Sequence, residues 1–119
     1  MGDSGSHRDE DTLRQIVERC DLITTFVAGM TDADFASDSK TLLATRMLIQ
    51  DIGEAANRLS TSFVAAHPEI PWAPIRGMRD ISAHAYAIIR VDVLYTTATA
   101  SIPRLRSQLA PLITDEPES

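Results

Sequence analysis

The sequence has little of several residues and patterns on which whole classes of protein depend. It holds one cysteine, Cys20, which excludes an intramolecular disulfide framework and any zinc site built from several cysteines. No apolar run approaches the ~20 residues that a helix needs to cross a bilayer, and no signal-peptide pattern is present. Glycine-rich phosphate loops, Ser-His-Asp arrangements and metal-ligand spacings are also lacking. We therefore expect a cytoplasmic protein with no membrane segment, metal site or cofactor.

The net charge of this 119-residue chain is −6, but it is unevenly distributed. Residues 1–40 carry nine acidic and four basic side chains and residues 111–119 carry three acidic ones, whereas residues 41–110 carry five acidic and seven basic ones. Acidity argues against a nucleic-acid partner, because phosphate binding needs clustered lysine or arginine. That argument does not apply to residues 41–110, where basic side chains outnumber acidic ones. Ten of the eleven basic residues are arginine, which suits bidentate phosphate contact but can equally reflect genomic base composition.

Hydrophobic periodicity predicts an all-α fold. Apolar residues recur at three- and four-residue steps, which predicts four helices, near residues 13–29, 40–66, 75–89 and 91–112. Short links between helices of this length favour an antiparallel bundle of four to five helices. We expect one domain over residues 10–112, a flexible leader over residues 1–9 and an acidic flexible tail over residues 113–119.

Capping residues and prolines set the expected boundaries. Ser39 or Asp38 can cap the second helix, Pro68 ends it, and Pro103 kinks or restarts the fourth. The connector that follows Pro68 contains Trp72, which we interpret as a core or corner anchor rather than a base-stacking platform. The apolar faces predict a common core made of Leu13, Ile16, Val17, Cys20, Ile23, Val27, Leu42, Leu43, Met47, Leu48, Ile52, Ala55, Ala56, Leu59, Phe63, Ile75, Met78, Ile81, Ser82, Ala85, Ile89, Val93, Leu94, Ile102, Leu105 and Leu109.

The densest polar segment runs from Arg76 to Tyr86. On a helix, Arg76, Asp80 and His84 fall at four-residue steps opposite the core side. Asp80, with Arg76 one turn before it, can then support His84 by fixing its tautomer and raising its basicity, as a general base requires. Arg79 and His84 lie about 140° apart on one helix, so they converge only if the helix ends near His84 or a second copy faces the first.

Two of these patterns have ordinary structural explanations. An arginine, a histidine and a tyrosine on a polar helix face also describe a solvated surface. Asp51 and Glu54 could be paired carboxylates for a metal, but they equally suit a helix face or a partner for arginine.

Several short segments together resemble a known family: Gln50–Asn57, Pro68–Trp72, Ile75–Asp80 and His84–Tyr86. They are similar to the HepT-like proteins of the HEPN superfamily, and the resemblance covers roughly residues 10–112. The family motif is an arginine, four residues, a histidine, one residue and a tyrosine, which Arg79, His84 and Tyr86 match position for position. Asp80 stands where the family usually has a polar residue.

The resemblance implies a dimeric helical bundle that acts as a metal-independent endoribonuclease toxin of a type II toxin–antitoxin system. RNA, either tRNA or mRNA, would be cut by attack of the ribose 2′-oxygen on the adjacent phosphate. His84 would move protons and Arg79 would stabilise charge on the phosphorus oxygens. The antitoxin would be MntA, a minimal nucleotidyltransferase that transfers AMP to Tyr86. The alternatives are a non-catalytic helical binding subunit of a nucleotidyltransferase pair and a purely structural dimerisation domain.

Overall fold

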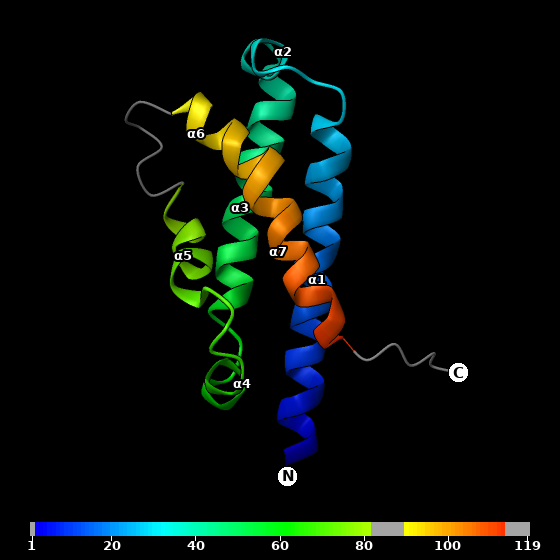
Figure 1. Cartoon of the computed structure of the whole chain (residues 1–119), viewed down its shortest axis with the longest axis vertical. Helices are drawn as coiled ribbons and strands as arrows, with labels where there is room; N and C mark the ends of the chain where they lie inside the picture. The colour runs from blue at the N-terminus through cyan, green and yellow to red at the C-terminus, as the bar shows by residue number, and fades with distance from the viewer. Residues whose placement is uncertain (1, 82–89, 114–119) are drawn as a thin grey trace, which may run out of the picture.

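The structure, a computed structural model, describes residues 2–81 and 90–113, with the side chains of residues 7–80 and 90–113 (Figure 1). Its elements are α1 (Gly2–Val27), α2 (Asp32–Ser37), α3 (Ser39–Ala56), α4 (Thr61–Ala66), α5 (Trp72–Gly77), the 3₁₀ turn η1 (Met78–Ile81), α6 (Val91–Thr96), the π-helical turn η2 (Thr97–Ser101), α7 (Ile102–Leu109) and the 3₁₀ turn η3 (Ala110–Leu112). Every regular element within these ranges is a helix, which confirms the predicted all-α fold.

Three long helical segments form the bundle. Helix α1 runs antiparallel to α3, and the continuous stretch α6–η2–α7 packs along α1 and contacts α3 through α6 (Figure 1). Helices α2 and α4 lie at opposite ends, whereas α5 and η1 lie along α3 on the side away from α1. None of the helices in the described ranges combines the length and hydrophobicity needed to span a bilayer.

The core lies between α1, α3 and α7. Its fully buried apolar side chains include Leu13, Ile16, Cys20, Ile23, Phe35, Ile49, Ile52, Ile102 and Leu109. Removing such side chains from water is the main favourable term in folding. Trp72 is also buried, and its indole Nε1 donates to the carbonyl of His67 at 2.8 Å, which confirms its role as an anchor.

The predicted core includes three residues that the structure places on the surface, and four more, Ile81, Ser82, Ala85 and Ile89, whose side chains lie outside the described ones. Leu43, Met47 and Val93 expose 45%, 60% and 46% of their area. The buried face of α3 contains the predicted residues Ile52, Ala55 and Ala56 and also Thr45 and Ile49, which are not among the predicted core residues. Apolar residues occupy two adjacent faces of α3, and only packing decides which face is covered.

The second predicted helix, residues 40–66, is two helices in the structure. The N-cap of α3 is Asp38, as predicted, and the Thr41 N–H and hydroxyl donate to it and lower the pKa of its carboxyl. The helix ends at Ala56, and α4 begins after Ser60, whose Oγ accepts from the N–H of Phe63 at 3.1 Å. A serine that caps a new helix ends the continuity that hydrophobic periodicity alone suggests.

The predicted leader also differs from the structure, because α1 already begins at Gly2. Asp9 is buried, and its carboxylate accepts bonds from the Ser60 N–H (2.9 Å) and hydroxyl (2.6 Å). These charge-assisted bonds tie the start of α1 to the junction of α3 and α4. The helical domain therefore begins before residue 10. Of the predicted acidic tail, only Ile113 is described, and it packs against the core.

Other helix boundaries differ from the predicted ones because of helix-capping residues and prolines. The polar connector before α3 contains α2, which a capping box between Thr31 and Asp34 begins. Helix α5 begins at Trp72 rather than after Pro74, since a proline in the first turn needs no N–H partner. Pro103 follows the π-helical turn η2, so the fourth predicted helix is interrupted where the sequence indicates.

Candidate functional site

The polar segment predicted to carry the chemistry begins where η1 crosses α3. The crossing is centred on Gly53: a Cβ built on this glycine would collide with the backbone nitrogen of Arg79 and lie 2.8 Å from the carbonyl carbon of Met78. Because both obstacles are backbone atoms, only a residue without a side chain permits this approach. Gly53 therefore places the backbone of Arg79 directly on α3.

The side chain of Arg79 extends from this fixed backbone into solvent. It is 54% exposed, and its Nε lies 3.8 Å from Oδ1 of Asp80, whose side chain is 66% exposed. A surface ion pair at this distance contributes little stability and leaves the guanidinium accessible to an anion. Asp80 thus contacts Arg79 in the described part of the chain.

Arg76 occupies the last turn of α5, one residue before the helix ends at Gly77. Because η1 is a 3₁₀ turn, the regular four-residue step predicted from Arg76 to Asp80 is not kept as a continuous α-helix. His84 and Tyr86 lie outside the described residues. The bond from Asp80 to His84, the convergence of Arg79 with His84 and the role of Tyr86 therefore stay predictions.

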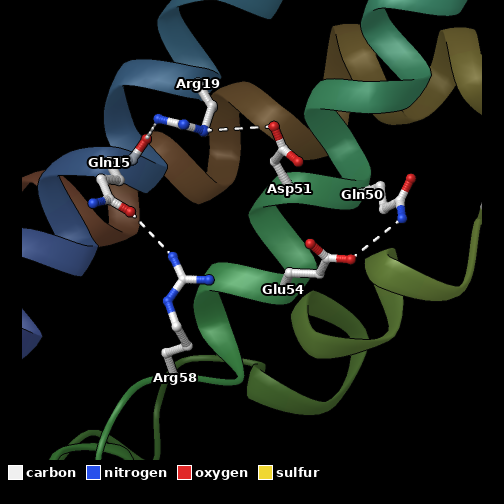
Figure 2. A network of polar contacts seen from close by, with 6 residues as sticks. All are labelled: Gln15, Arg19, Gln50, Asp51, Glu54 and Arg58. Carbon is white, nitrogen blue, oxygen red and sulfur yellow. Dashed lines mark hydrogen bonds and ion pairs between the residues drawn. The ribbon is translucent and has the colours of Figure 1, made fainter.

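Polar side chains on α3 separate into two groups (Figure 2). Toward α1, Arg19 lies 3.9 Å from Asp51, and Arg58 donates to Gln15 at 3.1 Å. On the side near α5 and η1, Gln50 donates to Glu54 at 3.3 Å. Asp51 is thus the partner of an arginine, which agrees with one of its two interpretations.

Within the described ranges, no three His, Cys, Asp or Glu side chains gather as a metal-binding group. The charged residues next to the crossing are Arg76, Arg79 and Asp80, on α5 and η1, and Glu54, which follows Gly53 on α3. Such a surface suits an anion whose charge is spread over several oxygens, because guanidinium groups bind phosphate through paired N–H donors.

Sequence reasoning missed two residues of this region. Gly53 lies in the Gln50–Asn57 segment that carries the family resemblance, but the sequence predicts no role for it, although glycine is the residue that allows close backbone approach. Arg46 was not selected either, yet its Nε and that of Arg76 are buried and have no hydrogen-bond partner in the described structure. No sequence signal distinguishes Arg46 from an ordinary helix-surface arginine.

Comparison with known proteins gives a consistent family. Residues 16–112 match the family model described as Ribonuclease HepT-like. A protein of Thermococcus cleftensis named "Probable ribonuclease HepT" is 37% identical over 107 residues, which cover 90% of this chain and 96% of that protein. A protein of Caldanaerobacter subterraneus subsp. tengcongensis named as an RNase is 30% identical over 104 residues, covering 87% and 93%. No solved structure matches the chain significantly.

Proposed function

The chain belongs to the HepT-like ribonuclease family, and from this premise we propose that it cuts RNA at the segment seated on Gly53. The observation that supports this placement is the position of Arg79. Its backbone is held against α3, whereas its guanidinium is exposed to solvent. A charged group on a fixed backbone is suited to stabilise charge that develops during a reaction, because little reorganisation is needed.

The proposed chemistry uses the RNA's own 2′-hydroxyl and no metal. A base removes the 2′-proton, and the 2′-oxygen attacks the adjacent phosphorus and displaces the 5′-oxygen, which takes up a proton. The products are a 2′,3′-cyclic phosphate and a 5′-hydroxyl. His84 moves the protons, Arg79 neutralises charge on the phosphorus oxygens, and Asp80 and Arg76 support them.

The proposed assembly is a homodimer in which two copies of the segment form one cleft. Arg79 and His84 are too far apart on a straight helix to reach one atom, so a second copy offers one way to bring them together. We further propose a cytoplasmic toxin neutralised by an MntA-like nucleotidyltransferase. AMP attached to Tyr86 would place an anionic, bulky group where RNA phosphate binds and would exclude the substrate.

A cleavage assay with purified chain, labelled tRNA and mRNA, and EDTA tests the catalytic proposal. His84→Ala should slow cleavage by about 10²–10⁴-fold and Arg79→Ala by about 10²–10³-fold, without a change in unfolding midpoint. The controls are His7→Ala and Arg104→Ala, since both side chains are exposed and lie on α1 and α7. RNA that stays intact with the wild-type chain would favour the non-catalytic binding subunit, whereas cutting by both variants at the wild-type rate would contradict the roles of His84 and Arg79.

Intact mass separately tests the regulatory proposal. The chain co-expressed with its neighbouring nucleotidyltransferase gene should gain mass in steps of one AMP group, and Tyr86→Phe should abolish the gain. A chain that keeps its unmodified mass would contradict the antitoxin relationship and leave the cleavage result unaffected.

A further inference from the structure

Arg46 lies on the side of α3 that carries η1. It precedes Gly53 by seven residues, which is almost exactly two helical turns, so both positions point in nearly the same direction. Gly53 faces the backbone of Arg79, and α5 and η1 lie along this side of α3 (Figure 1). Arg46 is therefore about 10 Å along the helix from the crossing that holds Arg79.

Part of the Arg46 side chain is buried without being neutralised, although the residue as a whole is only half-buried. Its Nε is buried and lacks a hydrogen-bond partner, and the same is true of the Nε of Arg76. Neither arginine forms an ion pair with a carboxylate among the described residues, in contrast to Arg19, Arg79 and Arg106. A buried donor without an acceptor is unfavourable, and a ligand that supplies oxygen acceptors removes the penalty.

We propose that Arg46 forms a second anion site that holds a phosphate of the RNA strand next to the one being cut. This inference rests on the proposed function. The separation along α3 is one that neighbouring nucleotides of a single strand can span. Arg46 is therefore a positioning residue: it binds substrate but does not contact the reacting atoms, so its loss should raise KM and leave kcat unchanged.

The test uses the full chain and a fluorescent single-stranded oligonucleotide with 2′-O-methyl groups throughout, which binds but cannot undergo 2′-oxygen attack. Affinity is measured by anisotropy over a series of NaCl concentrations. Arg46→Gln should weaken binding about tenfold. It should also reduce the slope of log K against log salt by about 0.7, as expected for one lost phosphate contact on a single strand.

Two further variants make the result specific. Arg46→Lys keeps the charge and should keep the salt slope, so it also serves if Arg46→Gln lowers the unfolding midpoint. Arg104→Gln removes the same charge from the exposed face of α7 and should leave affinity and slope unchanged. Equal effects of Arg46→Gln and Arg104→Gln, or no binding of the oligonucleotide by the wild-type chain, would overturn the anion site.

The binding and cleavage measurements together distinguish failure of the anion site from failure of the proposed cleavage. If the wild-type chain binds the oligonucleotide with the Arg46-dependent slope but leaves unmodified RNA uncut, the cleavage proposal fails and the anion site stands. If unmodified RNA is cut and Arg46→Gln has the wild-type KM and slope, the anion site is wrong and the cleavage proposal stands.

Discussion

Two faces of α3 differ in what covers them. The face toward the core carries Ile49 and Ile52, both fully buried among apolar side chains. The face toward η1 carries Gly53, which another backbone approaches closely, and Arg46, whose Nε is buried without a partner. Both faces thus hold a buried polar atom without a partner among the described residues, Thr45 Oγ1 on the core face and Arg46 Nε on the η1 face, but only the arginine carries a positive charge.

The two faces of α3 therefore contribute to different properties, the core face to stability and the η1 face to the proposed RNA cleavage. Burial of apolar area stabilises the first face and requires nothing from outside the chain. The second face keeps an unsatisfied donor on Arg46, which is unfavourable in the free protein, and an exposed guanidinium on Arg79, which is accessible to a ligand. Substitutions on the core face should therefore affect folding first, and substitutions on the η1 face should affect RNA cleavage first.

The largest effect on stability is expected from Ile52→Ala. Truncating a fully buried isoleucine removes apolar contacts and leaves a cavity, so the free energy of unfolding should fall by about 2–5 kcal/mol. Met47→Ala is the control on the same helix, because Met47 is 60% exposed and should change the value by less than about 0.5 kcal/mol. Urea titration of both variants measures the contrast, and equal losses would contradict the assignment of the two faces.

A smaller loss of stability but a larger loss of activity is expected from Gly53→Ala. The new Cβ meets backbone atoms of Met78 and Arg79 that no side-chain rotation can move, so η1 must shift. We expect a cost of about 1–3 kcal/mol and a loss of RNA cleavage. Gly77→Ala is the matched control, since its Cβ would meet nothing within 4 Å and alanine favours helix. Equal stability and cleavage in the two variants would show that the crossing does not hold Arg79.

The effect that is smallest near neutral pH, where the thiol is protonated in both states, concerns Cys20 on the core side of α1. Burial, and secondarily the charge of Asp21, raises the pKa of its thiol from 9.0 to about 12. Above pH 9 the unfolded chain releases this proton and the folded chain does not, so stability should fall as the pH rises from about 9 toward 12. Denaturant titration across this range, with Cys20→Ala as reference, isolates the thiol's share.

Alkylation checks the same burial directly. At pH 8 iodoacetamide should modify the thiol of Cys20 in urea but not in the folded chain, because the thiolate is the reactive form. Rapid modification of the folded chain would mean that this part of the core is open.

The helical class and much of the core could be predicted because they depend on local periodicity. Ile16, Ile52 and Ile102 lie at predicted core positions and are fully buried. Leu43 and Met47 were wrong because adjacent apolar faces look alike until packing selects one. The break after Ala56 follows from the Ser60 cap, a signal that is present in the sequence but competes with a continuous apolar pattern.

Residues of the candidate site could be predicted from the sequence, but the packing that positions them could not. Arg79 was identified from a motif, whereas the helix residue on which it sits, Gly53, is 26 positions earlier and no local rule pairs them. Arg46 has no motif at all, and its interest comes from a buried donor that only side-chain packing reveals. Contacts between residues far apart in the sequence, such as Gly53 with Arg79, cannot be predicted from the local pattern of a single sequence.

Photo-crosslinking most directly tests the claim that RNA binds the η1 face of α3. RNA containing 4-thiouridine is irradiated with the wild-type chain, and the modified tryptic peptides are identified by mass spectrometry. We expect crosslinks in peptides from α3, α5 and η1, reduced in Arg46→Gln and Arg79→Ala. Crosslinks concentrated in α1 and α7, with the α3 and η1 peptides unmodified, would contradict it.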